Sequence, residues 1–280
     1  MTDNSKNEKS VDLAGEHASF TEAEYGRLLD LAAAKYRFCD YVRQSDQPFV
    51  LWRHDVDYSP HRALALARLE AARGLRCIYH VLPGSRYYNP FEIEVVAVFR
   101  AIAALGHELG LHFDMDAFGE DGVVTEPDFD KRVSLERDVL EAVIGIELKS
   151  MSFHNFHINR ERLVQRDTIC NLVNASSVRF MQGFKYVSDS NGIWRYDRLR
   201  DVLEQPSFAR LHVLTHPEWW TEQPMPPVER LNRVIKGRAD ASFDIYAHQL
   251  RRDGRLRAIG ERIGFSADYI AAALAKDKES

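Results

Sequence analysis

The sequence predicts an α/β protein built on a parallel sheet or barrel. Between about residues 49 and 220, short apolar runs typical of strands alternate with amphipathic stretches typical of helices. Several of the apolar runs end in His, Asp or both. Functional side chains gather at the carboxyl ends of parallel strands in such folds, so this recurrence supports the same class.

The first expected strand covers residues 49–53. Ser59 suits a helix N-cap and Pro60 suits the first helical position, so a helix is expected to begin there and to end near Gly74. Further strands are expected at 77–82, 108–113, 150–153 and 211–215, and further helices at 90–106 and 128–144. Residues 168–190 mix short apolar pieces with polar turns and predict no clear element.

The ends of the chain differ from this alternating region. Residues 1–18 are polar and are expected to form a flexible tail. Residues 19–280 are expected to form a single α/β barrel domain, in which two or three amphipathic helices over about 228–275 form a C-terminal extension.

Composition limits the possible partners. The chain has 280 residues, 45% of them hydrophobic, with a formal net charge of -5. This charge gives no basic footprint, so no nucleic-acid partner is expected. No apolar run is long enough for a membrane span, and the N-terminus lacks the apolar core of a signal peptide. The three cysteines, at 39, 77 and 170, have no zinc or redox spacing, so a cytoplasmic protein with free thiols is expected.

The stretch from Arg53 to Pro60 is the most informative part of the chain. Asp55 and Asp57 are two residues apart, so on a strand they point the same way. Two carboxylates on one face repel each other, and burying them is costly unless a cation lies between them. The alternative is that both only cap the helix that begins at Ser59.

Imidazole groups follow or end the other expected strands, at His112, His154 and His216. Carboxylate oxygen and imidazole nitrogen are suitable ligands for a divalent ion. Asp116 comes four residues after His112 and would face the same way on a helical turn. An Asp/His/Asp or an Asp/His/His set would leave open positions for water and substrate.

Three motifs in this order resemble the polysaccharide deacetylases, which form carbohydrate esterase family four, the NodB-homology family. They are Arg-His-Asp-Val-Asp at 53–57, Gly-His-Glu-Leu-Gly-Leu-His at 106–112, and Leu-Thr-His-Pro at 214–217. The resemblance covers roughly residues 48–220. This region resembles in particular a branch associated with bacterial surface-polysaccharide loci, the WbmS-like proteins. It implies a metal-dependent, distorted (β/α) barrel that removes N- or O-acyl groups from sugars.

The resemblance also implies roles for individual residues. Asp55 falls on the family's catalytic base, Asp57 and His112 on metal ligands, and His216 on the general acid. The family's second metal-binding His is replaced here by Asp116.

Three further site residues are expected. His154 occupies the place of the family's Arg after the fourth strand and is a second candidate for the third ligand. Asp189 is a candidate to support the acid or the base. Trp219 and Trp220 directly follow His216, and exposed aromatic faces there could bind a sugar ring.

The implied activity is hydrolysis of an acyl amide or ester in surface-polysaccharide or lipopolysaccharide biosynthesis. The expected cofactor is a divalent ion, zinc, and the expected substrate is an acylated or amino sugar linked to a nucleotide or a lipid. A catalytically degenerate sugar-binding or scaffolding relative is the main alternative, because of the missing second His. A different barrel hydrolase, such as an amidohydrolase, usually has a His-x-His pair on its first strand, which this chain lacks.

Overall fold

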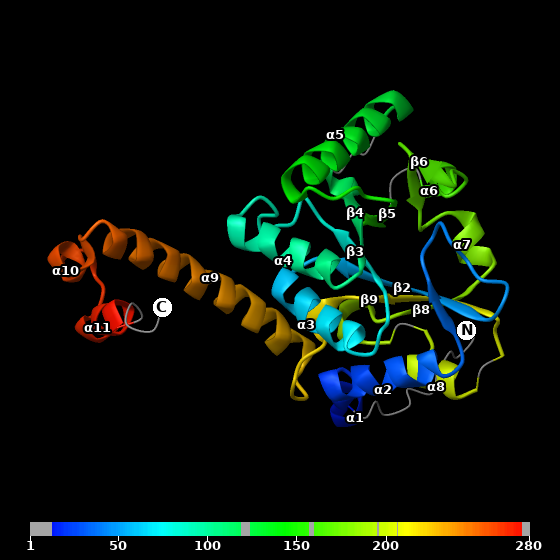
Figure 1. The fold of residues 1–280 in the computed structure, drawn as a ribbon, viewed down its shortest axis with the longest axis horizontal. Coiled ribbons are helices and arrows are strands. Elements are labelled where there is room, and N and C mark those ends of the chain that lie inside the picture. The colour runs from blue at the N-terminus through cyan, green and yellow to red at the C-terminus, as the bar shows by residue number, and fades with distance from the viewer. Residues whose placement is uncertain (1–12, 119–123, 157–159, 195, 206, 276–280) are drawn as a thin grey trace, which may run out of the picture. The chain divides into compact units, whose positions relative to one another are not determined.

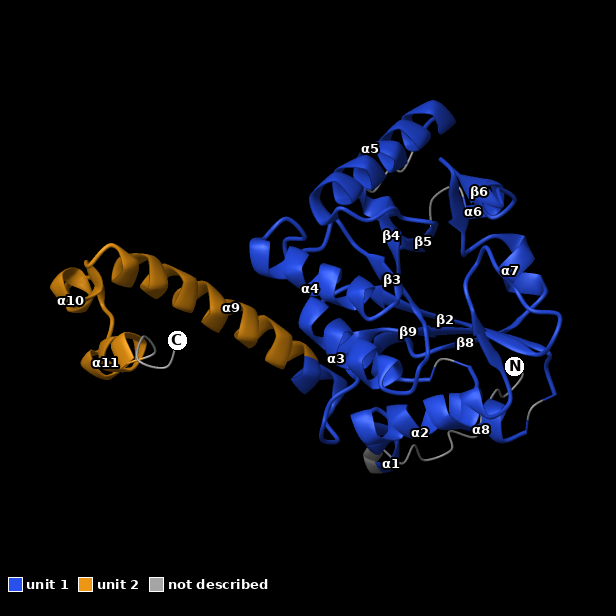
Figure 2. Ribbon diagram, in the orientation of Figure 1, with its two compact units in different colours: residues 1–230 blue, residues 231–280 orange. Residues whose placement is uncertain are grey.

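The computed structural model describes residues 13–118, 124–156, 160–194, 196–205 and 207–275. They form two compact units, residues 1–230 and 231–280 (Figure 2). The boundary lies close to the start of the C-terminal helical extension expected from about residue 228. Most of the segment expected as a tail, residues 1–12, lies outside the described residues, while Leu13–Ala18 forms the short helix α1.

The first unit contains a nine-stranded sheet in the order β6-β7-β5-β4-β3-β2-β9-β8, with β1 paired to β2 (Figure 1). The strands are β1 Arg37–Cys39, β2 Phe49–Val56, β3 Ile78–Val81, β4 Glu108–Asp114, β5 Ser150–His154, β6 Thr168–Ile169, β7 Leu172–Asn174, β8 Lys185–Ser188 and β9 Arg210–Thr215. Every pairing between them is parallel except that of β6 with β7. The expected α/β class is confirmed, and the sheet curls into a half-barrel.

Helices connect and cover these strands. They are α2 Glu22–Ala33, α3 Pro60–Ala71, α4 Ile93–Ala104, α5 Glu126–Ile144, α6 Arg160–Leu163, α7 Val178–Gln182 and α8 Leu199–Glu204, with 3-10 turns η1 Met115–Phe118, η2 Ser190–Gly192 and η3 Pro217–Trp219. As expected, the Ser59 hydroxyl caps α3 by accepting from the Arg62 backbone N–H at 3.3 Å. The region 168–190 contains β6, β7, α7 and β8, which are too short to show a periodic pattern.

Strand β2 lies inside the sheet and is buried at all eight positions. Val50 and Trp52 belong to the main apolar cluster that the sheet shares with its helices. Phe49 and Leu51 belong to a separate cluster with Tyr41 and other residues. Alternate side chains of β2 therefore enter two different environments, as the two-residue period of a strand requires. This alternation is what places Arg53 and Asp55 on one face and His54 on the other.

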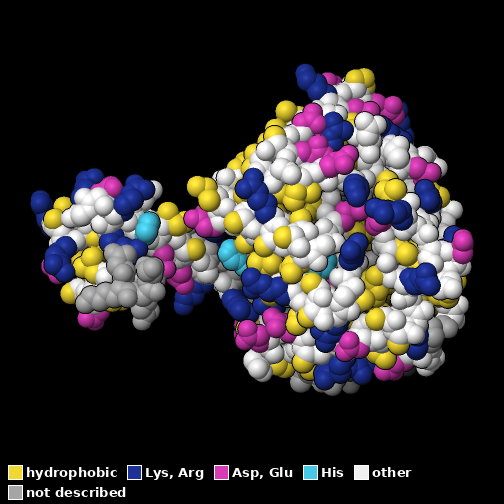
Figure 3. Space-filling view, viewed as in Figure 1, with side chains coloured by type: hydrophobic (Ala, Val, Ile, Leu, Met, Phe, Trp, Pro, Cys, Tyr) yellow, Lys and Arg dark blue, Asp and Glu magenta, His cyan; other side chains and the backbone are white. Residues whose placement is uncertain are grey.

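The second unit consists of helices. They are most of α9 Pro227–Arg252, which begins just before the boundary, then α10 Leu256–Ile259, the 3-10 turn η4 Glu261–Ile263 and α11 Ala267–Ala275. Leu250, Leu256 and Ile270 form its small apolar core. No described helix has the length and apolar character needed to cross a membrane. On the face shown in Figure 3, basic and acidic side chains are interspersed.

Candidate active site

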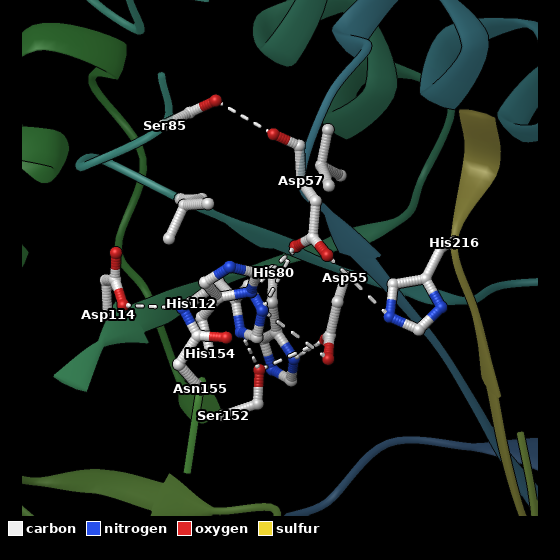
Figure 4. Close-up of polar contacts among 12 residues, drawn as sticks. Asp55, Asp57, His80, Ser85, His112, Asp114, Ser152, His154, Asn155 and His216 are labelled. Atoms are coloured by element: carbon white, nitrogen blue, oxygen red, sulfur yellow. Dashed lines mark hydrogen bonds and ion pairs between the residues drawn. The ribbon is translucent and has the colours of Figure 1, made fainter. Parts of the chain in front are cut away.

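The structure brings the polar ends of four strands together. Asp57 directly follows β2, His112 lies in β4, His154 ends β5, and His216 follows β9 (Figure 4). These strands lie within the parallel run β5-β4-β3-β2-β9, so their carboxyl ends meet at one edge of the sheet. The gathering expected from the strand ends is therefore present.

Asp57, His112 and His154 form a compact set of potential metal ligands. One ligand atom from each lies within 4.8 Å of the other two. Asp57 Oδ1 is 3.2 Å from His112 Nε2 and 3.5 Å from His154 Nδ1. This oxygen is buried and has no hydrogen-bond partner among the described residues. A buried, unsatisfied carboxylate oxygen facing two imidazole nitrogens fits a divalent cation.

The charge state of Asp57 suits a metal ligand. Burial alone would raise the pKa of this carboxyl group, but the His112 and His154 rings outweigh burial and lower it. For His154, burial favours the neutral ring, and the contact with Asp57 outweighs it and raises the pKa. The carboxylate is therefore ionised.

A neighbouring hydroxyl orients His112. Ser152 lies opposite it in the pairing of β4 with β5, and the His112 Nδ1 to Ser152 Oγ distance is 2.7 Å. This contact uses Nδ1 and leaves Nε2 directed at the carboxylates. Metal-binding histidines are commonly fixed by such a second partner.

His154, and not Asp116, completes the set. After β4 the chain enters the turn η1, where Asp116 is exposed and its Oδ2 accepts from Asn155 Nδ2 at 2.9 Å. The expectation that Asp116 shares a face with His112 is wrong because His112 lies within a strand, where the four-residue period of a helix does not apply. His157, three residues after His154 in the sequence, lies outside the described residues.

Three donors surround Asp55. Arg53 Nη2 donates to its Oδ2 at 3.0 Å, and Ser152 Oγ donates to Oδ1 at 3.1 Å. His80 Nδ1 lies 3.2 Å from the same Oδ1. Burial would raise the pKa of Asp55, but the charge of Arg53 leads the effects that outweigh it and hold the pKa well below its usual range. Asp55 is thus a fixed, ionised carboxylate beside the ligand set.

Sequence reasoning missed Arg53 and His80 as site residues. Arg53 could have been found, because it lies two residues before Asp55 and must share its face of the strand. His80 pairs with Asp55 across β2 and β3, which only the sheet order reveals. A Cβ atom on Gly110 would come within 2.1 Å of the His80 ring, so glycine is what lets this ring fit beside β4. Burial lowers the pKa of His80 to about 4, leaving it neutral.

His216 lies across the site from the two histidines of the ligand set (Figure 4). Its Nδ1 is 2.7 Å from Asp189 Oδ1, and its Nε2 is 3.8 Å from Asp57 Oδ2. Burial would lower the pKa of His216, but Asp189 outweighs it and raises the pKa to about 10. The structure therefore places Asp189 next to the expected acid and fixes that ring as an imidazolium.

The two tryptophans behave differently. Trp220 is fully buried and its indole N–H donates to Asp189 Oδ2 at 2.9 Å, so it offers no exposed face to a sugar and the expectation is wrong for this residue. It is buried because the apolar ring packs on Phe20 and Tyr25. Trp219 is 7% exposed and lines the cleft, with its ring centroid 5.8 Å from that of Tyr58.

A cleft of about 1140 Å³ opens over these residues. Its walls include Asp55, Asp57, His112, His154 and His216. Tyr58, Tyr87 and Trp219 form an aromatic wall on one side, with the Tyr58 and Tyr87 ring centroids 4.3 Å apart. Arg86 and Arg160 also line it, and both are exposed.

Comparison with known proteins gives structural neighbours only. No protein-family model and no curated protein matches the sequence. A pseudoenzyme of carbohydrate esterase family 4 from Bacillus anthracis aligns at 10% identity over 71% of this chain and 63% of its own, with a TM-score of 0.43. Its mutant with restored enzymatic activity aligns over 65% of its own length, so this chain spans less than two thirds of both.

Two further neighbours are aligned over more of their length. A family 4 carbohydrate esterase from Streptomyces lividans, in complex with acetate, aligns at 13% identity over 71% of this chain and 91% of its own, with a TM-score of 0.41. A peptidoglycan N-acetylglucosamine deacetylase aligns at 16% identity over 74% of this chain and 88% of its own, with a TM-score of 0.45. The solved structures that this half-barrel is similar to thus include polysaccharide deacetylases of carbohydrate esterase family 4.

Proposed function

We propose that this protein is a metal-dependent hydrolase that removes an N- or O-acyl group from a sugar. One observation carries the proposal: Asp57, His112 and His154 converge within 4.8 Å, with Asp55 and His216 beside them in one cleft. A ligand set with open positions, a fixed carboxylate and an imidazolium are the groups that acyl hydrolysis requires.

The residues suited to hold the ion are Asp57, His112 and His154, which provide one oxygen and two nitrogen ligands. When bound, a zinc or similar divalent ion would polarise the acyl carbonyl and lower the pKa of a water. Ser152 would keep His112 in the tautomer that directs Nε2 at the ion.

Asp55 would accept the proton of the attacking water. It lines the cleft beside the ligand set, and Arg53, His80 and Ser152 hold both of its oxygens. Fixed donors of this kind orient a carboxylate and prevent it from turning into the ligand set.

His216 would donate a proton to the departing sugar amine or alcohol. Its Nδ1 is engaged by Asp189, which leaves Nε2 directed at the cleft near Asp57. The Asp189 carboxylate also accepts from the His216 backbone N–H at 3.0 Å and from the Trp220 indole, so the whole group is fixed.

The cleft suits an acylated amino sugar. The wall of Tyr58, Tyr87 and Trp219 offers aromatic surface against which a sugar ring can pack. Arg86 and Arg160 provide charge for a phosphate, which favours a nucleotide- or lipid-linked sugar. Such precursors occur inside the cell, so we assign the protein to the cytoplasm and to surface-polysaccharide biosynthesis.

The first test is the metal content of protein purified without chelators or a metal-affinity tag. About one divalent ion per chain is expected in the wild type and little in an Asp57→Ala/His112→Ala double variant. Acyl release from a panel of N- and O-acetylated amino sugars is then measured. Absence of metal in the wild type after dialysis against zinc, cobalt and nickel would reject the proposal.

A non-catalytic sugar-binding relative is the second candidate. The departure at Asp116, where the resemblance leads one to expect His, favours it, although His154 occupies the third position of the ligand set. Asp55→Asn separates the two candidates. An enzyme would lose turnover and keep its sugar ligand, whereas a binding protein would show no turnover even as the wild type and would keep its ligand in the variant.

A further inference from the structure

We propose that an inner arm of the cleft binds an oxygen atom at the far end of the substrate's acyl group. The inner arm is the part of the cleft lined by Arg53, Ala175, Ser176, Tyr186, His212 and Leu214. The proposal rests on the proposed function, because it names the class of acyl group that the same site would take.

The inner arm lies below the ligand set inside the half-barrel. Arg53 comes two residues before Asp55 on β2, so it lies roughly 6.6 Å deeper on the same face. Leu214 pairs with Arg53 across β2 and β9, and Tyr186 pairs with His212 across β8 and β9. These pairings continue the same inner surface from the ligand set toward the lower end of the barrel.

A buried donor in the inner arm lacks a partner. Arg53 is 5% exposed, and its Nε has no hydrogen-bond partner among the described residues. Its Nη2 is engaged, because it donates to Asp55. The neighbouring His212 is 2% exposed, and its Nε2 lies 2.8 Å from the Tyr41 hydroxyl. A buried donor left without a partner is costly, so such an atom points to a ligand or a specific function.

The chemistry of the Arg53 guanidinium determines which class of ligand atom can bind there. A guanidinium only donates, so the partner of Arg53 Nε must be an acceptor oxygen. Asp55 already balances the positive charge of Arg53, so this oxygen can belong to a hydroxyl as well as to a carboxylate. An acetyl group carries no oxygen beyond its carbonyl, and Arg53 lies roughly 6.6 Å deeper than Asp55, so an acetyl group offers this donor no acceptor. We therefore infer that the acyl group is a hydroxyacyl or carboxyacyl chain.

The test measures binding and so does not depend on turnover. The zinc-loaded full chain is titrated with acetate, butyrate, 4-hydroxybutyrate and succinate by isothermal titration calorimetry. These acids correspond to products of deacylation, and the last three have similar lengths. We expect 4-hydroxybutyrate and succinate to bind at least about tenfold more tightly than butyrate, since one satisfied buried donor separates them.

Two variants locate the preference. Ser176→Leu fills the inner arm, and it should remove the preference while acetate binds as before. Ser134→Leu, on helix α5 outside the cleft, is the matched control and should leave all four affinities unchanged. Arg53→Lys keeps the charge and removes Nε, so it should also abolish the preference. Urea unfolding checks that each variant folds.

Equal affinity for butyrate and the two oxygenated acids would overturn the proposal. A preference that persists in both Ser176→Leu and Arg53→Lys would overturn it as well, because the oxygen would then be recognised elsewhere. Acyl release from acetylated sugars without this preference would reject the inner arm and leave the proposed function intact. A preference without any acyl release would reject hydrolysis and retain the inner arm as a binding site.

Discussion

The two faces of strand β2 carry similar polar groups and use them differently. On the helix-facing side, Glu70 of α3 accepts from the Tyr25 hydroxyl and from Tyr79 OH at 2.7 Å, and lies 2.7 Å from His54 Nε2. His54 Nδ1 is in turn 2.7 Å from Thr215 Oγ1. Both carboxylate oxygens are therefore satisfied, and Glu70 and His54 are completely buried. This network joins helices α2 and α3 to the sheet.

On the cleft side, the carboxylate is not satisfied. Asp57 Oδ1 has two imidazole nitrogens nearby and no hydrogen-bond partner among the described residues. Proximity alone does not separate the two sets, because His54, Glu70 and Cys77 also have ligand atoms within 4.8 Å of one another. The difference is that one set is closed by donors and the other lines the cleft. Satisfaction of the oxygens, more than spacing, distinguishes a structural network from a candidate metal site.

The largest effect is expected from removing the ligand set. Asp57→Ala/His112→Ala should abolish metal binding and acyl release, a loss beyond the roughly 10–100-fold that removing an outer-shell partner costs. Metal content by mass spectrometry and acyl-release assays measure this. If the double variant kept one metal ion per chain, the ion would have to be bound by other residues, such as His54, Glu70 and Cys77, and the contrast between the two faces would be wrong.

Glu70→Gln should instead weaken the fold. It removes one partner of a buried ionised network, which costs on the order of 3–5 kcal/mol of unfolding free energy. Urea unfolding of the metal-free protein measures this loss. The metal content of the folded variant should equal that of the wild type, and a lower content would show that the two faces are not independent.

The wild type and the Glu70→Gln variant should also differ in how their stability depends on pH. Burial would raise the pKa of Glu70, but the attraction of His54 outweighs it and lowers the pKa. A lowered folded pKa stabilises the fold above the unfolded value near 4.3, and this contribution is lost as the pH falls through the folded pKa. The advantage of the wild type over Glu70→Gln should thus be complete above about pH 5 and shrink below it. An advantage that grows on acidification would contradict the assignment.

Ser152→Ala should have an intermediate effect on the cleft side. Ser152 contacts both His112 Nδ1 and Asp55 Oδ1, so its loss frees one ligand and one oxygen of the proposed base. Metal affinity should fall about 10–100-fold while the unfolding free energy of the metal-free protein changes little. Competition with a fluorescent chelator measures the affinity. An unchanged affinity would mean that the ring of His112 is fixed by packing alone.

The smallest effect is expected at Asp116. Asp116→Asn changes an exposed residue outside the ligand set, so stability should stay within about 0.5 kcal/mol of the wild type. Metal content and turnover should also be unchanged. A loss of metal here would restore Asp116 as a ligand in place of His154, which the matched His154→Ala variant would decide.

The parts of this fold that depend on local patterns could be predicted from the sequence. Strands β2, β4, β5 and β9 are long enough to show apolar runs, and their polar ends identified Asp57, His112 and His216. The α/β class followed from the alternation of strands and helices and is confirmed. The prediction that Asp116 shares a face with His112 was wrong because it assumed a helical period, whereas the chain there is a strand followed by a 3-10 turn.

Contacts between distant segments could not be predicted. Glu70 lies in a helix 16 residues after His54, and nothing in the local pattern shows that it turns toward the sheet. His80 becomes a neighbour of Asp55 only through the order of the strands. Trp220 follows Trp219 directly, but its partners Phe20 and Tyr25 come from the other end of the first unit.

The turn between β2 and α3 links the two faces of β2 through one short segment. Asp57 directly follows the strand, Ser59 caps the helix, and that helix carries Glu70. An ion held by Asp57 would therefore report on the folding of α3, because melting the helix would release the turn that fixes its ligand. By mass action, each tenfold excess of free ion over its dissociation constant would add about 1.4 kcal/mol to the stability of the first unit. The melting temperature of the first unit would then rise with the concentration of free metal ion.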